Sequence, residues 1–375
     1  MTAVTTTQLQ PARIREVVRI ALERPDAELA SLAVTPAAHV VDNMTTESLH
    51  HVAGTLDDGT AWRLFAKVLQ PASASPLMQF IPPEHHEPVM ANLDWLDEPR
   101  VYRSGLRGDL PDGLRLPLVH AIDEADDRIV LWLEHVDDAG AWDLDQYADA
   151  ARLLGRLSGR WPEGRVADEL GIGRRDLGYL FFGKLSTVDI PVVTSDEHWR
   201  DPVLRSVADD GFRADLHRLI AAAPALIALE GRLPHGLAHG DATPHNLLLD
   251  AAGGAGGDLV AIDWSYGCRG PYGADLGQLL AGRFDAGDAD PADAPRIAAV
   301  LLDAYLDGLA AEGVEADRSA VEAAWAIHLA IRSAISAVLV DHRTGLTDDE
   351  RAAVLARRVA VARIGLDLAA QVRTD

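Results

Sequence analysis

The sequence is poor in cysteine, in long apolar runs and in basic residues, and each shortage excludes a class of protein. The single cysteine, Cys268, excludes an internal disulfide, and no cysteine and histidine spacing typical of a zinc site accompanies it. No run approaches the roughly eighteen apolar residues that span a bilayer, and the N-terminus lacks the basic start and apolar core of a signal peptide. We therefore expect a protein of a reducing compartment, the cytoplasm, with an inert thiol and no membrane partner.

The shortage of basic residues also limits the partners. The chain holds 34 Lys and Arg against 58 Asp and Glu, which gives a formal net charge of −24. Phosphate backbones need a basic footprint, so this balance argues against a nucleic-acid partner. It is compatible with a cationic substrate, and just as compatible with a general bias toward solubility. With 375 residues, 48% of them apolar, the chain is long enough for one large core or two modest ones.

What the sequence does have is a group of proton- and metal-handling side chains between residues 239 and 263. His239, Asp241 and Asn246 lead into an apolar run, and a glycine-rich connection separates it from a second run that ends at Asp263. Two short apolar runs joined in this way predict a hairpin that brings Asn246 and Asp263 side by side. Phosphoryl transfer needs Mg²⁺ on the nucleotide phosphates and a carboxylate at the attacking hydroxyl. Asn246 and Asp263 suit the metal, and Asp241 suits the hydroxyl.

This pattern, His-x-Asp-x-x-x-x-Asn followed by a metal-binding Asp, resembles the aminoglycoside phosphotransferase and choline kinase branch of the protein-kinase-like fold. The resemblance has motif support over residues 40–282. It implies a two-lobed α+β fold, with a small β-rich nucleotide-binding lobe (1–134) and a larger, mainly α-helical catalytic and substrate lobe (135–375). It also implies Mg²⁺ with ATP or GTP, and a small molecule with a hydroxyl group as acceptor. In this pattern Asp241 is catalytic, and His239 shapes the catalytic loop.

A second part of the site is expected upstream. The runs 49–56 and 60–70, separated by the turn signal Asp57-Asp58-Gly59, predict two strands, and the second strand carries Lys67 within an apolar stretch. A lysine held rigidly on a strand favours an anionic partner such as a nucleotide phosphate, with a surface lysine on an edge strand as the alternative.

In the resembled fold this lysine pairs with a glutamate on the next helix. Residues 91–106 are typical of that helix, and Glu98 is the best partner, with Asp97 and Glu87 as competitors. Pro99 interrupts a continuous helix, so the helix either begins near Asp97 or is kinked there.

Two further segments should contact the nucleotide. The segment 43–49, where the resemblance implies a glycine-rich loop, contains no glycine, so Thr45 and Thr46 would have to supply hydroxyls and amides, and nucleotide affinity is the property in doubt. The run 128–136 leads into the expected hinge, where Glu134 and Val136 should line the site of the base together with His135.

The remaining chain is mainly helical by pattern. Apolar residues at helical spacing predict helices over 11–23, 142–161, 202–229, 291–313, 316–340 and 348–372. Residues 162–199 lack a sustained period and are either a substrate-side excursion or a structural insertion. The segment after Asp263 is too short for a long activation loop, which favours a small-molecule kinase over a protein kinase.

The acceptor is not identified by the sequence. Asp275 either braces the catalytic loop or caps a helix, and the candidate acceptor contacts, each of which also fits a packing or solvated role, are Tyr266, Arg269, Arg283, Asp285, Trp325 and Asp341. An aminoglycoside would require a cluster of carboxylates for its ammonium groups, whereas a sugar, nucleoside or amino alcohol would not. Antibiotic resistance, biosynthetic tailoring and primary metabolism all remain open as roles, as does the oligomeric state.

Two other functions remain open at this point. The glycine-free segment favours a non-catalytic nucleotide-binding protein of the same fold. His239, Asp241, His245 and Asp263 together fit a metal-dependent hydrolase, which would act with metal alone and without nucleotide.

Overall fold

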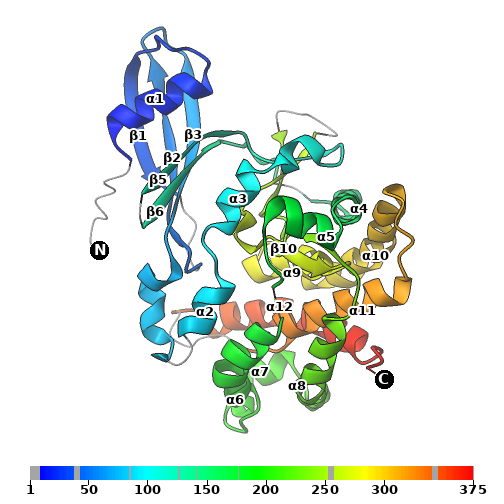
Figure 1. Cartoon of the computed structure of the whole chain (residues 1–375). Coiled ribbons are helices and arrows are strands. Elements are labelled where there is room, and N and C mark those ends of the chain that lie inside the picture. The colour runs from blue at the N-terminus through cyan, green and yellow to red at the C-terminus, as the bar shows by residue number, and fades with distance from the viewer. Residues whose placement is uncertain are drawn as a thin grey trace.

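The computed structural model describes residues 9–37, 43–83, 86–125, 127–140, 142–175, 177–251, 257–339 and 345–374. Its N-terminal part is built on a five-stranded antiparallel sheet, and its C-terminal part is mainly helical (Figure 1). The sheet has the order β1-β2-β3-β6-β5, with the bounds β1 (Leu29–Pro36), β2 (Thr46–Leu56), β3 (Ala61–Leu69), β5 (Val119–Ala125) and β6 (Arg128–Glu134). The mixed α+β class and the placement of its two parts agree with the sequence prediction.

The two faces of this sheet belong to different cores. Helix α1 (Pro11–Ala21) lies against one face of the sheet (Figure 1), where Ile14, Val17 and Val18 are buried. On the other face Leu69 and Leu131 join the large core of the C-terminal part. The strands β2, β3 and β6 were predicted, whereas β1 and β5 were missed because neither alternates clearly between apolar and polar residues.

The C-terminal part is a stack of helices around two apolar cores. Its helices are α4 (Leu144–Arg160), α5 (Glu163–Arg165), α6 (Ile190–Val193), α7 (Pro202–Val207), α8 (Asp210–Glu230), α9 (Asp275–Ala286), α10 (Ala294–Ala311), α11 (Arg318–Leu329) and α12 (Asp348–Ala369), while α2 (His86–Asn92) and α3 (Asp97–Arg103) lie between β3 and β5 in the chain. Helices α4 and α10 approach so closely that a Cβ at Gly155 would lie 2.1 Å from the carbonyl oxygen of Tyr305, and one at Gly308 would lie 2.1 Å from that of Arg152. Glycine is therefore required at both positions of this contact.

Three details of the helical prediction change. Helix α3 begins at Asp97, so Pro99 falls in the first turn, where proline is tolerated. The helix predicted over 202–229 is wrong as a single element, because Ala208 is extended and Asp209 caps a new helix by accepting a hydrogen bond from the Phe212 amide. The segment 162–199 is largely helical, and its π-helical stretch η6 (Tyr179–Asp189) packs into the second core with α8 and α12.

Short strands outside the five-stranded sheet position the residues of the candidate active site. Strands β8 (Leu247–Leu249) and β9 (Leu259–Ala261) form the predicted antiparallel hairpin, and β4 (Leu114–Arg115) adds to β9 in parallel. Strands β7 (His235–Ala238) and β10 (Cys268–Pro271) pair beside it. The amide of Ile262 donates to the carbonyl oxygen of Asn246 over 2.9 Å, so the two ends of the hairpin are adjacent.

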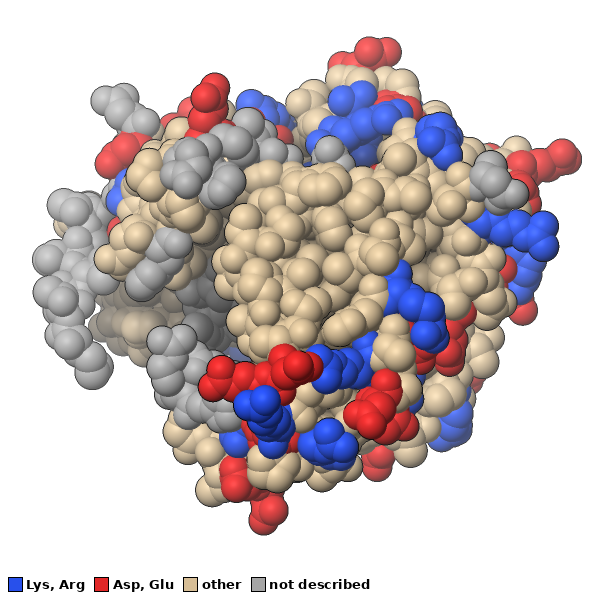
Figure 2. Space-filling view, turned by 90° about the horizontal axis from the view of Figure 1, so that it is seen from below, with Lys and Arg blue, Asp and Glu red and all other residues tan. Residues whose placement is uncertain are grey.

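The acidic charge is not spread evenly over the surface. Figure 2, the view from below Figure 1, shows a broad area without charged side chains, with Lys, Arg, Asp and Glu near its edges. Phe182, Val188 and Val192, from η6 and α6, are among the exposed large hydrophobic side chains. Within the described part of the chain, no helix combines the length and the apolar character needed to cross a bilayer.

Candidate active site

The loop that carries Asp241 is hydrogen-bonded to Asp275, the first residue of α9. Its carboxylate accepts hydrogen bonds from the amides of His239 and Gly240, each over 2.8 Å. Gly240 has φ +78°, and a Cβ there would lie 1.9 Å from the carbonyl oxygen of Tyr266. The brace expected of Asp275 is therefore present, and the loop conformation depends on glycine at position 240.

His239 joins this loop to the end of the hairpin. The imidazole is fully buried, Nε2 lies 2.9 Å from the carbonyl oxygen of Ile262, and Nδ1 accepts from the amide of Asp241 over 3.3 Å. Because a carbonyl oxygen can only accept, Nε2 is the nitrogen that donates in this contact. The ring also lies 4.6 Å from that of Trp264. His239 thus links the Asp241 loop to the end of the hairpin.

The two carboxylate oxygens of Asp241 have different neighbours. The Asn246 amide nitrogen donates to Oδ2 and to the main-chain oxygen of Asp241, each over 2.9 Å. Gln278 donates to Oδ1 over 2.8 Å, and Nη2 of Arg332 lies 3.7 Å from the same oxygen. Gln278 and Arg332 were not foreseen. Gln278 lies one turn after Asp275 on the same helix face, so helical spacing could have identified it, whereas nothing in the sequence signals Arg332.

Lys67 on β3 reaches across to the hairpin. Its ammonium lies 2.8 Å from Glu98 Oε2 and 2.7 Å from Asp263 Oδ1, and the side chains of Lys67 and Glu98 are only 4% and 2% exposed. The predicted Lys67–Glu98 pair is confirmed. Glu87 and Asp97 are not its partners, since Asp97 pairs with Arg100 over 2.8 Å and Lys67 has no contact with Glu87 among the described ion pairs.

Burial and charge act on these three groups in different directions. Burial alone would lower the pKa of Lys67, but the carboxylates of Asp263 and Glu98 raise it. Burial raises the pKa of Glu98 to about 7 against the opposing effect of Lys67. Asp263 also feels burial, yet the Lys67 ammonium lowers the pKa of its carboxyl to about 2. The site therefore holds an excess of negative charge when Glu98 is ionised, which favours a cation nearby.

The hairpin ends fit a magnesium ion. Asp263 has φ +54° and ψ +67°, an uncommon conformation for a residue other than glycine, which turns its carboxylate toward Lys67. Its Oδ1 contacts Lys67 and accepts from the Ser265 amide over 3.3 Å, while the Asn246 amide nitrogen faces Asp241 and leaves the carboxamide oxygen for another partner. Oxygen donors of this kind suit Mg²⁺, which takes one or two protein ligands and completes its shell with phosphates and water. No group of three or more His, Cys, Asp and Glu at metal-binding distance occurs among the described residues.

The glycine-free segment ahead of β2 is fixed by Asn43, which the sequence analysis did not single out. Asn43 Oδ1 accepts from the amide of Thr45 over 2.9 Å and from its hydroxyl over 2.8 Å, and Asn43 Nδ2 donates to the hydroxyl of Ser265 over 3.0 Å. The Thr45 hydroxyl is thus already engaged. The Thr46 hydroxyl is buried with no hydrogen-bond partner in the described structure, so it keeps its capacity for another acceptor.

The predicted hinge is tied to the hairpin. Arg115 pairs with Glu134 and, over 2.7 Å, with Asp250, so the Glu134 side chain is engaged by the protein itself. Val136 is half-buried. The imidazole of the neighbouring His135 lies 5.3 Å from that of His51 on β2, so aromatic rings from the sheet and the hinge meet at this end.

Most of the expected acceptor contacts have other partners. Tyr266 borders the catalytic loop through its backbone, and burial raises the pKa of its hydroxyl. Trp325 is 4% exposed in the large core. The charged candidates are engaged, Arg269 by Glu163 at 3.6 Å, Arg283 by Asp288 at 3.7 Å and Asp285 by Arg358 at 3.7 Å. Asp341 lies outside the described residues.

The two remaining nucleophilic or ligating side chains near the loop are also accounted for. His245 Nε2 lies 2.8 Å from Asp288 Oδ2 on the exposed side of the loop. Because His239 and His245 face separate partners, the four residues of the hydrolase hypothesis do not point to one metal. Cys268 is buried, which raises the pKa of its thiol to about 12, as expected for an inert cysteine.

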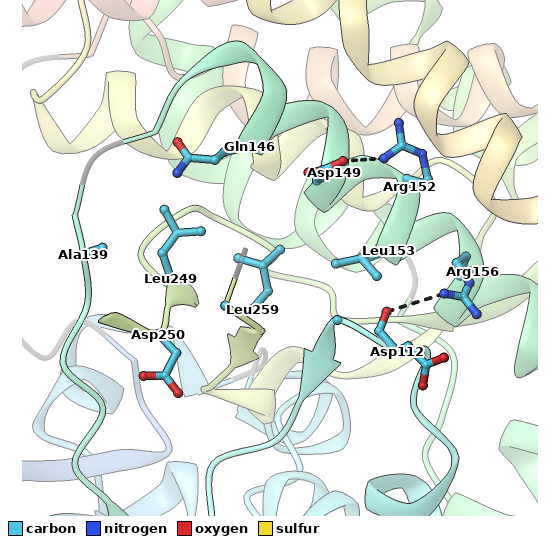
Figure 3. Close-up of a pocket in the computed structure, with 12 residues that line it drawn as sticks. Asp112, Ala139, Gln146, Asp149, Arg152, Leu153, Arg156, Leu249, Asp250 and Leu259 are labelled. Atoms are coloured by element: carbon cyan, nitrogen blue, oxygen red, sulfur yellow. Dashed lines mark hydrogen bonds and ion pairs between the residues drawn. The ribbon is translucent and has the colours of Figure 1, made fainter. Parts of the chain in front are cut away.

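A separate cavity of about 450 Å³ is bordered by the hairpin and by α4 (Figure 3). Leu249, Asp250 and Leu259 contribute from the hairpin, and Gln146, Asp149 and Leu153 from α4, while Asp149 bonds Arg152 and the main chain of Asp112 bonds Arg156 over 3.5 Å. None of Lys67, Asp241, Asn246 and Asp263 lines it. The cavity is therefore distinct from the group of residues described above.

The chain is similar to one protein family and to several solved structures. A model of the phosphotransferase enzyme family matches residues 106–317, more than half of the chain. No curated protein matches the sequence. Among solved structures, similarity is found to an aminoglycoside phosphotransferase from Alicyclobacillus acidocaldarius (15% identity, 89% of this chain and 91% of that chain, TM-score 0.48). It also extends to an amicoumacin kinase in complex with AMP-PNP, Ca²⁺ and Ami (13%, 95% and 96%, 0.49) and to an ethanolamine kinase of Plasmodium vivax (12%, 88% and 82%, 0.45).

Proposed function

The chain belongs to the phosphotransferase enzyme family, and from that premise we propose that it transfers the γ-phosphoryl group of ATP or GTP to a hydroxyl group of a small molecule. One observation carries the proposal. Lys67 of the N-terminal sheet lies 2.7 Å from Asp263, and His239 connects Asp263's neighbour Ile262 with the loop of Asp241. A phosphate-binding cation, a metal-binding end and a proton acceptor therefore belong to one connected unit.

The roles follow from the contacts of each side chain. Lys67, oriented by Glu98, binds the nucleotide phosphates. Asn246 and Asp263 would hold Mg²⁺, which would neutralise charge on the phosphates. The hydroxyl oxygen of the acceptor bonds to the γ-phosphorus, the bond to the leaving nucleoside diphosphate breaks, and the hydroxyl proton passes to Asp241.

The same proposal assigns the remaining contacts. Thr46 offers its free hydroxyl to the phosphates, Thr45 shapes the segment above them, and the backbone at Glu134 and Val136 borders the base. We place the boundary between the nucleotide lobe, residues 1–134, and the catalytic and substrate lobe, residues 135–375, at the end of β6. The cytoplasm is the compartment we propose, since ATP, GTP and a reducing environment occur there together.

The experiment is mass spectrometry of sugars, nucleosides, amino alcohols and aminoglycosides incubated with the protein and the magnesium complex of ATP or GTP. We expect one acceptor class to gain one phosphoryl group. Asp241→Asn should reduce transfer by about a thousandfold, because a general base contributes roughly that factor, and should keep the rise in melting temperature that magnesium nucleotide causes. Asp263→Ala should remove that rise. Wild-type turnover in the Asp241→Asn protein would contradict the assignment of the base.

A further inference from the structure

We propose that the acceptor carries an anionic group, a carboxylate or a phosphate, next to the hydroxyl that is phosphorylated, and that Arg332 binds this group. The inference rests on the proposed function and deepens it. Its starting point is the division of the Asp241 carboxylate into two edges with different neighbours.

One edge belongs to the metal side of the site. Oδ2 of Asp241 accepts a hydrogen bond from Asn246. Asn246 and Asp263 flank the same hairpin, and Asp263 contacts Lys67. The other oxygen, Oδ1, faces Gln278 at 2.8 Å and Arg332 at 3.7 Å. Because the phosphates follow the metal and Lys67, the hydroxyl that reaches Asp241 arrives along the Oδ1 edge. Gln278 and Arg332 therefore border the acceptor and not the nucleotide.

Arg332 lies within ion-pair distance of Asp241, at 3.7 Å, and still has N–H donors that make no hydrogen bond within the described residues. It comes from the π-helical stretch η11 (Ala330–Ala334), and its Nη1 donates to the carbonyl oxygen of Gly240 over 2.5 Å. That is the one hydrogen bond it makes within the described residues, and a guanidinium has five N–H donors in a planar fork. The side chain is 22% exposed and that of Asp241 is 29% exposed, so both are accessible to a ligand. The fork matches the geometry of a carboxylate or phosphate.

The surroundings of Arg332 also disfavour a cation. The Arg175 guanidinium stacks on the Tyr266 ring at 4.5 Å. Burial raises the pKa of the Tyr266 hydroxyl, and the positive charges of Arg175 and Arg332 oppose that rise. Asp241 lies 3.7 Å from Arg332 on this side, and the other carboxylates here are engaged, since Asp97 pairs with Arg100 and Asp275 accepts from backbone amides. An ammonium group would meet two guanidinium groups, which repel it.

The first test is a panel of acceptors matched in size and different in charge. Glucose, gluconate, glucose 6-phosphate, glucosamine and kanamycin are incubated with wild-type protein and magnesium ATP or GTP, together with glycerol, glycerate and glycerol phosphate. Transfer to the anionic members, at a kcat/KM about tenfold or more above their neutral counterparts, supports the proposal, since a hydrogen bond to a charged group contributes roughly that factor. Gluconate against glucose 6-phosphate, and glycerate against glycerol phosphate, separate a carboxylate from a phosphate.

The failures are distinguishable. Preferred transfer to glucosamine or kanamycin overturns the anionic acceptor and leaves the kinase intact. Absence of transfer to every compound, with no effect of magnesium nucleotide on the melting temperature, overturns the proposed function and this inference with it. If no compound is phosphorylated although magnesium nucleotide still binds, the inference is overturned, because the panel contains anionic acceptors of both the glucose size and the glycerol size.

The second test separates acceptor binding from support of the loop. Arg332→Gln should raise KM for the anionic acceptor about tenfold, with kcat within a factor of about two, since it loses a charged hydrogen bond; Arg332→Lys should recover part of the loss. Arg358→Gln is the matched control, because Arg358 likewise donates to a main-chain oxygen, that of Leu339, and lies 3.7 Å from a carboxylate, that of Asp285. An equal loss of kcat for all acceptors, with KM unchanged, would assign Arg332 to the loop and contradict the proposal.

Discussion

Glu98→Gln should make the protein more stable at neutral and alkaline pH while it reduces phosphoryl transfer. Glu98 is 2% exposed, and burial raises the pKa of its carboxyl from the ordinary 4.5 to about 7 although Lys67 lies 2.8 Å away. The ionised carboxylate is therefore more costly in the folded state than in the unfolded chain. Glutamine has the same shape and no charge, and Lys67 keeps its 2.7 Å contact with Asp263.

The size of the effect follows from the pKa difference between the two states. A group whose pKa is higher in the folded state contributes stability that is fully present below pH 4.5 and lost as the pH rises through 7. The difference of 2.5 units between about 7 and 4.5 corresponds to at most about 3 kcal/mol of unfolding free energy. The Glu98→Gln protein lacks this pH dependence. The unfolding free energy of the variant, relative to that of the wild type, should therefore rise by up to that amount between pH 5 and pH 8.

The assay is urea denaturation of both proteins at several pH values from 5 to 8. Burial lowers the pKa of His50 and His120, which gives the opposite pH dependence, but both histidines are present in both proteins and cancel in the difference. Phosphoryl transfer should fall in the variant, because Lys67 loses the carboxylate that orients it. A difference in unfolding free energy that stays constant from pH 5 to pH 8 would refute the reasoning.

Two further predictions concern the support of the catalytic loop. Asp275→Ala should lower the unfolding free energy by about 3 kcal/mol, because it leaves the buried amide of His239 and the partly buried amide of Gly240 without an acceptor; an unchanged midpoint in urea would contradict the brace. Gly240→Ala should destabilise by roughly 2 kcal/mol or more, because position 240 has φ +78° and a Cβ there would lie 1.9 Å from the Tyr266 carbonyl oxygen, and a melting temperature equal to that of the wild type would count against it.

The sequence predicted the local parts of this site well. His239, Asp241, Asn246 and Asp263 are separated by short stretches whose hairpin is readable from two apolar runs and a glycine-rich connection. Lys67 was also recognisable, since it interrupts an apolar strand, and it is one of only two lysines in the chain. Local pattern and a resembled motif were sufficient where the partners are close in sequence.

The rest of the site depends on contacts between distant segments. Arg332 reaches Gly240 across 92 positions, and Arg115 reaches Asp250 across 135, and no periodicity encodes either meeting. Asn43 ties its segment to Ser265 across 222 positions by a single hydrogen bond. Such side chains are selected by the assembled fold, so a single sequence contains no signal for them. The strands β1 and β5 were missed for a related reason, because their pattern reflects an edge position that only the sheet order reveals.

The contacts between the hinge segment and the hairpin limit how these two parts of the site can move relative to each other. Besides the Arg115 bridge, the amide of Ala139 donates to the Leu249 carbonyl oxygen and the amide of Ala251 to that of Asp137, so the segment after β6 is laced to β8. This segment is therefore not an independent flexible linker. Any tilt of the sheet relative to the hairpin would therefore change the distance between Lys67 and Asp263, whereas Asn246 and Asp263 are kept together by the backbone bond between Ile262 and Asn246.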